Sequence, residues 1–223
     1  MTGRTPNWAH VPLHSALGRA LDGRSAWHAT RTRTAFVPLP LDWDALPGNL
    51  RRQHAKRERR VRADHAITYA RTTGELLRMQ PELERLHAAR WAPAPRPSTS
   101  QPDWGAVLSE LTDTTAFIAT ITIDGTLAAA QLCLYRSTTC WSLRPAMNPG
   151  AARLAPGHLL LRRLIDDLSS HGFTGLDLGR TAETDGQTGY KEQYQPRWNT
   201  ALSCTPIRPP RPAAGQVALA SSA

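Results

Sequence analysis

The chain has 223 residues, with 27 arginines and lysines against 18 acids, a formal net charge of +9 and an isoelectric point near 10.4. This length suffices to bury a hydrophobic core, and the charge makes nucleic acid or another phosphate-rich molecule a candidate partner. Its 3 cysteines lack paired spacing, which argues against a disulfide framework and against a metal site. No apolar run approaches membrane-spanning length and the first residues lack a signal-peptide core, so we expect a cytoplasmic protein with no membrane partner.

The first strongly patterned segment is "NLRRQHAKRERRVR" (49–62), which predicts a basic helix that Asn49 could cap. At about 100° per residue, one narrow helix face carries Leu50, His54, Arg57 and Val61. The broad opposite face carries the remaining bases, Arg51, Arg52, Lys56, Arg59, Arg60 and Arg62. Like charges at this spacing cost helix stability, and a polyanionic partner would offset that cost. The alternative is a solvated basic face that only aids solubility.

Less strongly patterned segments flank this helix. Residues 26–37 and 66–72 predict strands. Residues 74–91 predict a helix that Pro81 distorts or splits in two. One side of that helix carries Leu76, Met79, Leu83, Leu86 and Arg90. A proline-rich loop is expected over 92–102.

The clearest pattern begins at Ala116. Residues 116–123 and 126–135 are apolar strands around an Asp124-Gly125 turn, which is a strong hairpin signal. A third strand is expected over 138–147. Its regular pairing should fail or bulge near Arg144 and Pro145, because proline cannot donate to a strand ladder.

The remaining segments complete a mixed sheet with a helix packed across it. A helix is predicted from Pro156 to about His171, with Gly172 ending it. A short buried strand (173–179), a helical turn (190–194) and a final strand (197–207) follow.

This layout permits an anion site. A strand that loses pairing at Pro145 leaves backbone N–H groups free, and the helix that begins at Pro156 directs its positive end to the same side. Free N–H groups beside a helix N-terminus can hold an anion or the oxyanion of acyl transfer. The alternative is that Pro145 merely ends an edge strand.

The order of these segments also carries a family resemblance. "ITIDGTLAAAQLCLY", "APGHLLLRRLIDDLSSHGFTGLDLGR" and "GYKEQY", preceded by "LRRQHAKRERR" and "LHAARW", resemble the GNAT acyltransferase superfamily. The similarity runs over residues 36–205 and is greatest to the branch related to the Fem transferases, which move amino acids from aminoacyl-tRNA to an amine. It implies an α/β fold with a GNAT-like mixed, mostly antiparallel central sheet, packed helices and an N-terminal basic helical region.

Two features depart from the family pattern. Fem transferases resemble a tandem pair of GNAT domains, and too little chain precedes the basic helix for a full first domain. GNAT enzymes that use acetyl-CoA carry a turn of the form Arg/Gln-x-x-Gly-x-Gly/Ala, whose N–H groups cradle pyrophosphate. Here the turn reads "RLAPGHLL", with Gly157 as its one glycine and a proline that removes a donor. This second departure favours tRNA over CoA.

Four residues are catalytic candidates. Lys191 follows Tyr190 as in the "YK" of that branch, and its cation would stabilise an oxyanion or anchor a phosphate, unless it is a surface lysine. Asp177 closes a buried strand, where it would orient the acceptor amine, accept its proton or merely cap the next turn. Tyr190 and Tyr194 would protonate the leaving hydroxyl, with core packing as the alternative for at least one of them.

Phosphate contacts are expected from the broad basic face and from Gly157 and His158 at the start of the later helix. The expected function is amide formation by transfer of an aminoacyl group from aminoacyl-tRNA, a co-substrate rather than a bound cofactor, to an amine of a small-molecule acceptor. Two alternatives remain, an acyl-CoA-dependent N-acyltransferase that uses acetyl-CoA and a non-catalytic RNA-binding protein. The expected organisation is an N-terminal extension (1–36), an acyltransferase domain (37–206) and a disordered tail (207–223).

Overall fold

The computed structural model describes residues 8–12, 19–20, 27–61, 65–91, 104–109, 115–181 and 187–206. The chain divides into two compact units, one formed by Met1–Thr32 with Thr200–Ala223 and the other by Arg33–Asn199. In the first unit, β1 (Trp8–Pro12) pairs antiparallel with the later part of β8 (Arg197–Pro206). The candidate site lies in the second unit.

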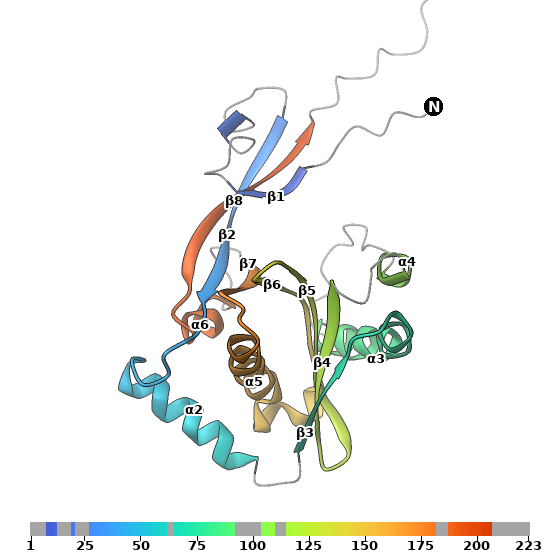
Figure 1. The fold of residues 1–223 in the computed structure, drawn as a ribbon, viewed down its shortest axis with the longest axis vertical. Helices are drawn as coiled ribbons and strands as arrows, with labels where there is room; N and C mark the ends of the chain where they lie inside the picture. The colour runs from blue at the N-terminus through green and yellow to red at the C-terminus, as the bar shows by residue number, and fades with distance from the viewer. Residues whose placement is uncertain are drawn as a thin grey trace, which may run out of the picture. The chain divides into compact units, whose positions relative to one another are not determined.

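The second unit is built on a mixed sheet (Figure 1). Its strands run in the order β2-β7-β6-β5-β4-β3. Their bounds are β2 (Trp27–Pro38), β3 (His65–Ala70), β4 (Ala116–Ile123), β5 (Thr126–Arg136), β6 (Thr139–Met147) and β7 (Gly175–Thr181). β6 and β7 pair in parallel, and the other described pairs are antiparallel. The predicted mixed, mostly antiparallel sheet is therefore confirmed.

Helices cover both faces of this sheet (Figure 1). On one face lies α5 (Pro156–Ser170), with α2 (Gly48–Arg60) packed against it. On the other lies α3 (Thr73–Trp91), next to α4 (Trp104–Ser109). A 3₁₀ helix, η1 (Pro149–Leu154), precedes α5, and α6 (Gln187–Glu192) contacts β7.

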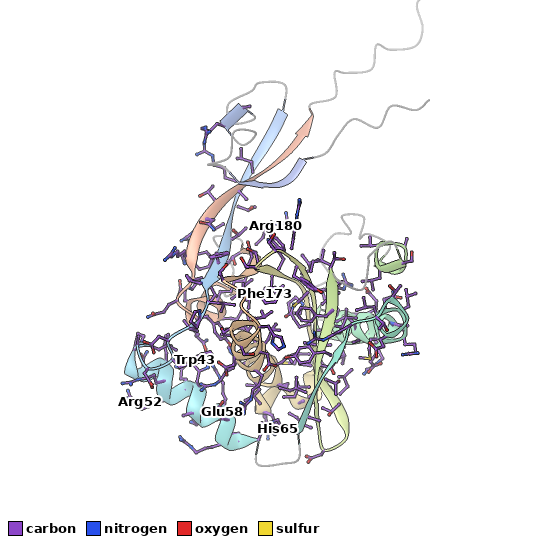
Figure 2. All side chains as sticks on the ribbon, viewed as in Figure 1. Trp43, Arg52, Glu58, His65, Phe173 and Arg180 are labelled. Carbon is purple, nitrogen blue, oxygen red and sulfur yellow. The ribbon has the colours of Figure 1, made fainter. Side chains whose placement is uncertain are left out.

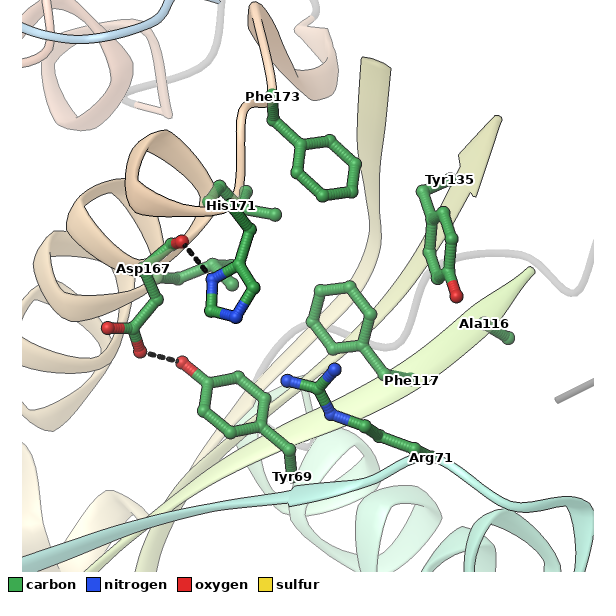
Figure 3. A pocket seen from close by; sticks show the side chains of 10 residues that line it. Tyr69, Arg71, Ala116, Phe117, Tyr135, Asp167, His171 and Phe173 are labelled. Atoms are coloured by element: carbon green, nitrogen blue, oxygen red, sulfur yellow. Dashed lines mark hydrogen bonds between the residues drawn. The ribbon is translucent and has the colours of Figure 1, made fainter. Parts of the chain in front are cut away.

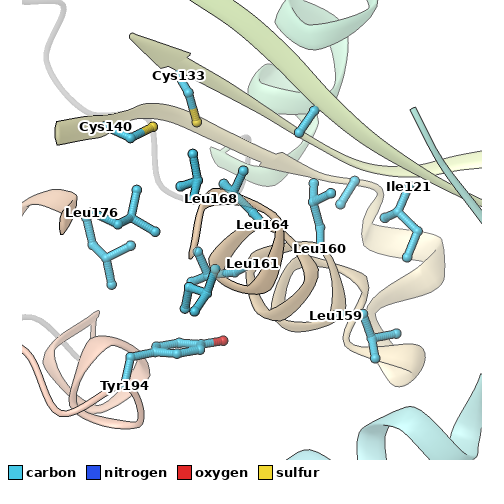
Figure 4. Close-up of a cluster of buried hydrophobic side chains, with 14 of the residues drawn as sticks. Ile121, Cys133, Cys140, Leu159, Leu160, Leu161, Leu164, Leu168, Leu176 and Tyr194 are labelled. Carbon is cyan, nitrogen blue, oxygen red and sulfur yellow. The ribbon is translucent and has the colours of Figure 1, made fainter. Parts of the chain in front are cut away.

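Two apolar clusters hold the helices to the sheet. The cluster under α5 contains its leucines, with Leu160, Leu164 and Leu168 all buried (Figure 4). The cluster under α3 contains Leu83 and Ile118, both almost fully buried. Burying each large aliphatic side chain stabilises the fold by about 1.5–3 kcal/mol.

The predicted hairpin is confirmed in detail. β4 and β5 pair from Ala116↔Leu134 to Ile123↔Thr126, around Asp124 and Gly125. These two residues have φ values of 50° and 72°. A type I′ turn needs positive φ at both central residues, and Asp-Gly supplies them at low cost.

Several local predictions were wrong or incomplete. Asn49 is not the cap of the basic helix, because α2 begins at Gly48 with Pro47 as N-cap and no side-chain cap bond. Pro81 does not split α3, since it lies at an exposed position where solvent can reach the unpaired carbonyl of the preceding turn. The sequence reading missed β1 and α4. The loop over 92–102, the tail over 207–223 and most of residues 1–26 lie outside the described residues.

Candidate active site

The parallel strands β6 and β7 separate where the candidate site lies. They pair over three positions, Thr139↔Gly175, Cys140↔Leu176 and Trp141↔Asp177, and no further along the described strands. From Ser142 onward the edge of β6 that faces β7 has lost its ladder partner. This opening lies at the end of β6 that leads through η1 into the N-terminus of α5.

β6 loses its pairing on the edge that faces β7, not on the edge that faces β5. With β5, β6 stays paired through Pro145 to Met147, so pairing does not fail near Arg144 and Pro145, and the irregularity predicted there is a bulge. The Asn148 N–H donates to the Ala128 carbonyl of β5 at 2.9 Å. Because successive N–H groups of a strand point to opposite edges, the nitrogen of Pro145, three residues earlier, points away from β5. The proline nitrogen thus faces the open side, where it interrupts no ladder bond.

A β-bulge in β6 accompanies this pairing. Leu132 pairs with Arg144 and Cys133 with Ser142, which leaves Leu143 as the extra residue. A bulge increases local twist and turns the strand away from its neighbour. It contributes to the separation of β6 from β7.

β7 has a matching irregularity at Gly179. Thr34 pairs with Arg180 and Phe36 with Asp177, so β7 has one residue more than β2 over this stretch. Gly179 has φ of 75°, a left-handed conformation that other residues adopt at a cost. A Cβ at this position would also lie 3.4 Å from the Ser142 carbonyl oxygen of β6.

Lys191 holds this irregular part of β7. Its Nζ donates to the Gly179 and Arg180 carbonyl oxygens at 2.7 Å each, and the residue is 5% exposed. Burial lowers the pKa of Lys191 to about 8, an effect that nearby Asp177 partly opposes. The alternative of a surface lysine is therefore wrong.

Asp177 lies at the last β6–β7 pair. Its Oδ1 accepts the Gly179 N–H at 2.6 Å, which is the turn-capping contact expected as one alternative. Burial raises the pKa of Asp177, while the Gly179 N–H and Lys191 act in the opposite direction. A carboxylate with a raised pKa beside a cation has the character of a general base.

Tyr194, Tyr190 and His158 form a second group. The Tyr194 hydroxyl lies 3.0 Å from His158 Nδ1, and Tyr194 is fully buried. The rings of His158 and Tyr190 meet edge to face with centroids 5.0 Å apart. Desolvation raises the pKa of Tyr194, so its hydroxyl stays protonated at neutral pH. The Tyr194 N–H donates to the Lys191 carbonyl at 3.0 Å, which joins this group to Lys191 through α6.

The N-terminus of α5 offers few backbone donors. Ala155 precedes it in a left-handed conformation, with φ of 54°, and its carbonyl accepts the N–H groups of His158 and Leu159. Pro156 has no N–H. The N–H of Gly157 is therefore the first-turn donor left for an anion, in contrast to a glycine-rich cradle.

The narrow face of α2 docks onto the site. His54 is 2% exposed, with its ring 5.4 Å from that of Tyr194 and 5.2 Å from that of Trp43. Arg57 donates to Gln193 Oε1 at 2.7 Å. Helical periodicity places His54 and Arg57 on one narrow face of α2, but no sequence signal pointed to Trp43 or Gln193 as their partners.

The single acid of the basic segment also has a docking role. Glu58 pairs with Arg162 of α5 at 2.8 Å, and the Arg162 guanidinium lies over the Trp43 ring at 4.4 Å. Trp43 in turn donates to Asp166 at 2.7 Å. These contacts fix α2 against α5.

The broad face of α2 is exposed, as predicted. Its exposed bases are Arg51, Arg52, Lys56, Arg59 and Arg60. Figure 2 shows Arg52 on the outer side of the helix. At the end of α2, Arg60 donates to the Arg153 carbonyl oxygen at 3.4 Å, so the face reaches the turn before α5. Arg62 lies outside the described residues.

The arrangement offers groups that suit acyl transfer. Within the described ranges, no group of three or more His, Cys, Asp or Glu side chains is placed to hold a metal ion. What the site does offer is an open strand edge, a buried cation, a carboxylate and a tyrosine–histidine pair. Such groups position reactants and stabilise an oxyanion or move a proton.

The chain belongs to the acetyltransferase (GNAT) domain family, whose model matches residues 48–192. No curated protein sequence matches the chain.

Three solved structures illustrate the similarity in fold. One is the C-terminal domain of a protein described as a lysylphosphatidylglycerol synthetase from Agrobacterium fabrum, with TM-score 0.56, 15% identity and coverage of 81% of this chain and 62% of that chain. Another is L-PGS from Bacillus licheniformis, with TM-score 0.55, 15% identity and coverage of 80% and 62%. FemX aligns with TM-score 0.56 and 13% identity over 76% of this chain and 61% of its own. The chain thus spans about six tenths of these structures.

None of the helices in the described ranges is long and apolar enough to cross a membrane.

Proposed function

We propose that the protein transfers an aminoacyl group from aminoacyl-tRNA to an amine of a small-molecule acceptor. The observation that carries this proposal is the exposed basic face of α2, which ends where Arg60 reaches the turn before α5. A phosphate-rich donor bound along this face would end beside the opening between β6 and β7. The resemblance to the Fem transferases supports the same donor.

The reaction balances without a cofactor. The neutral amine attacks the ester carbonyl carbon of the aminoacyl-tRNA, and a C–N bond forms as the C–O bond to the ribose breaks. The amine loses one proton and the ribose oxygen gains one. Positioning and oxyanion stabilisation account for most of the rate enhancement in this type of chemistry.

The site residues have proposed roles in these steps. The unpaired edge of β6 and the Lys191 ammonium stabilise the oxyanion, since two of the three Nζ protons are held by β7 carbonyls and one remains. Asp177 accepts the amine proton. The Tyr194–His158 pair supplies a proton to the leaving ribose oxygen.

An acyl-CoA-dependent N-acyltransferase is the second candidate. The family model is that of an acetyltransferase domain, which favours it. The first turn of α5 argues against it, because Pro156 and the Ala155 carbonyl leave Gly157 as the first-turn N–H for a pyrophosphate.

Salt dependence of tRNA binding separates these functions. Each phosphate contact contributes about −0.7 to −0.9 to the slope of log affinity against log salt. Three or four contacts from α2 predict a slope of roughly −2 to −4. Arg52→Glu with Arg59→Glu should flatten this slope and raise KM for charged tRNA more than it lowers kcat.

A matched control is available on other elements. Arg78→Glu with Arg136→Glu changes the net charge equally at two exposed positions away from α2, and should leave the slope close to that of the wild type. Product formation from candidate amines should require charged tRNA and stop on RNase treatment. Acylation from acetyl-CoA that RNase and the α2 variants leave unchanged would replace the proposal with the second candidate. Binding without turnover would indicate an RNA-binding protein.

A further inference from the structure

A pocket of about 340 Å³ lies at the other end of α5, away from the candidate active site. It is lined by the C-terminal half of α5 and by the ends of β3, β4 and β5 (Figure 3). Asp167, which lines it, is nine residues beyond His158, or roughly 14 Å along the helix at 1.5 Å per residue. The pocket is therefore separate from the site of acyl transfer. Its volume is in the range of small-molecule sites, about 300–1,000 Å³.

Aromatic rings form much of the pocket wall. Ring centroids lie 5.9 Å apart for Tyr69 and Phe117, 6.0 Å for Phe117 and Tyr135, and 5.7 Å for Tyr135 and Phe173. Figure 3 shows these rings around one space rather than stacked into a closed core. Surfaces of this kind take flat apolar rings.

Two polar side chains of the pocket, Tyr69 and Asp167, bond to each other. The Tyr69 hydroxyl donates a short hydrogen bond to Asp167 (Figure 3). Burial, together with this bond, raises the pKa of Tyr69, so the phenol keeps its proton. Asp167 Oδ2 is thus already bonded within the pocket wall.

Arg71 supplies the charge available to a ligand. Its side chain is exposed, and its guanidinium lies 5.2 Å from the Tyr69 ring centroid. It therefore occupies the place over this ring that a ligand ammonium could otherwise take. Its backbone N–H donates to Glu75 at 2.9 Å, which fixes it at the start of α3. Among the described residues, no carboxylate forms an ion pair with its guanidinium. The forked guanidinium matches a carboxylate.

His171 adds a second polar group. Its Nδ1 lies 2.7 Å from the Asp167 carbonyl oxygen, which can only accept, so Nδ1 carries the proton and Nε2 is the other polar atom of the ring (Figure 3). A ligand ring with a polar substituent could meet it.

We infer that this pocket binds a small aromatic carboxylate, with the ring among Tyr69, Phe117, Tyr135 and Phe173 and the carboxylate on Arg71. This site is independent of the acyl donor. It is a second small-molecule site on the enzyme.

Titration of the ¹⁵N-labelled full chain with trans-cinnamate tests the inference, with neutral cinnamamide as the comparison ligand. Cinnamate should saturate amide shifts clustered at the pocket residues, with a dissociation constant in the millimolar range typical of so small a ligand. Cinnamamide should bind at least roughly threefold more weakly, because it lacks the charge that pairs with Arg71.

Two variants locate the effect. Arg71→Gln should bring the acid and the amide to equal affinity, whereas Arg78→Gln, an exposed arginine that does not line the pocket, should preserve the difference. Shifts scattered over the surface, no saturable binding, or equal affinity of wild-type protein for acid and amide would overturn the inference.

Discussion

Burial decides what Lys191 can do. A lysine before a glutamate in a short helical turn is compatible with the surface, and the resemblance to the "YK" of Fem-type transferases pointed to a role in the site. In the fold, it donates to two carbonyls of β7 and so maintains the strand conformation beside the site. Its substitution should therefore lower stability as well as turnover, since both carbonyls would lose a partner.

The pKa of Lys191 is directly measurable, because Lys56 is the only other lysine in the sequence. With ¹³C-labelled lysine, Lys56→Arg leaves one ε-carbon signal, which should titrate near pH 8 instead of the ordinary 10.5. Between about pH 8 and 10.5 the unfolded chain then binds more protons than the folded chain, so the free energy of unfolding should rise with pH across that window. The charged lysine is in place below pH 8, where turnover should be supported. Titration near 10.5 would contradict the burial of the ammonium.

Tyr194 is the second residue whose role depends on its partner. Tyr194→Phe keeps the packing and removes the hydroxyl that meets His158. If the pair moves a proton, kcat should fall by roughly 100-fold, while the stability should fall by only about 1 kcal/mol. Steady-state kinetics beside urea denaturation would measure both. An unchanged kcat would leave Tyr194 a packing residue.

At the scale of elements, the irregular strands β6 and β7 create the site. The extra residue in β6, the left-handed Gly179 in β7 and the buried Lys191 all lie where the two strands part. The basic helix illustrates the same point, since Glu58, which dilutes its charge, binds Arg162 of α5. The irregularities of β6 and β7 and the position of Glu58 therefore determine contacts between elements rather than stabilise the elements in which they lie.

Gly179→Ala tests the strand geometry. An alanine at φ of 75° should cost about 1–2 kcal/mol and would place its Cβ 3.4 Å from the Ser142 carbonyl oxygen. We expect a lower urea midpoint and reduced turnover. The comparison is Gly157→Ala, because Gly157 has open space around it and a φ outside the left-handed region. Equal stability of both variants would contradict the strain at Gly179.

At the scale of the whole second unit, two clusters on opposite faces of one sheet share the stabilisation. Ile165 belongs to the α5 cluster and Ile118 to the α3 cluster, and both are fully buried. Each Ile→Val change should cost about 0.5–1.5 kcal/mol.

Combining these changes tests the independence of the two clusters. Ile118→Val with Ile165→Val should be additive within about 0.5 kcal/mol, because the residues share no cluster. Ile121→Val with Ile165→Val, both in the α5 cluster, should depart further from additivity. Equal coupling in both pairs, measured by urea denaturation of the full chain, would show that the sheet transmits strain between its faces.

Elements whose signals are local could be predicted from the sequence. The Asp124-Gly125 hairpin, the leucine face of α5 and the sorted faces of α2 follow from turn chemistry and periodicity, which depend on neighbours a few residues apart. Tertiary structure alone decided the rest. Which edge of β6 opens, that Lys191 is buried against Gly179, and that His54 meets Tyr194 all depend on residues far apart in the chain. Local pattern gives the probable state of a segment, but pairing and burial energies between segments fix its partners, and those partners make the site.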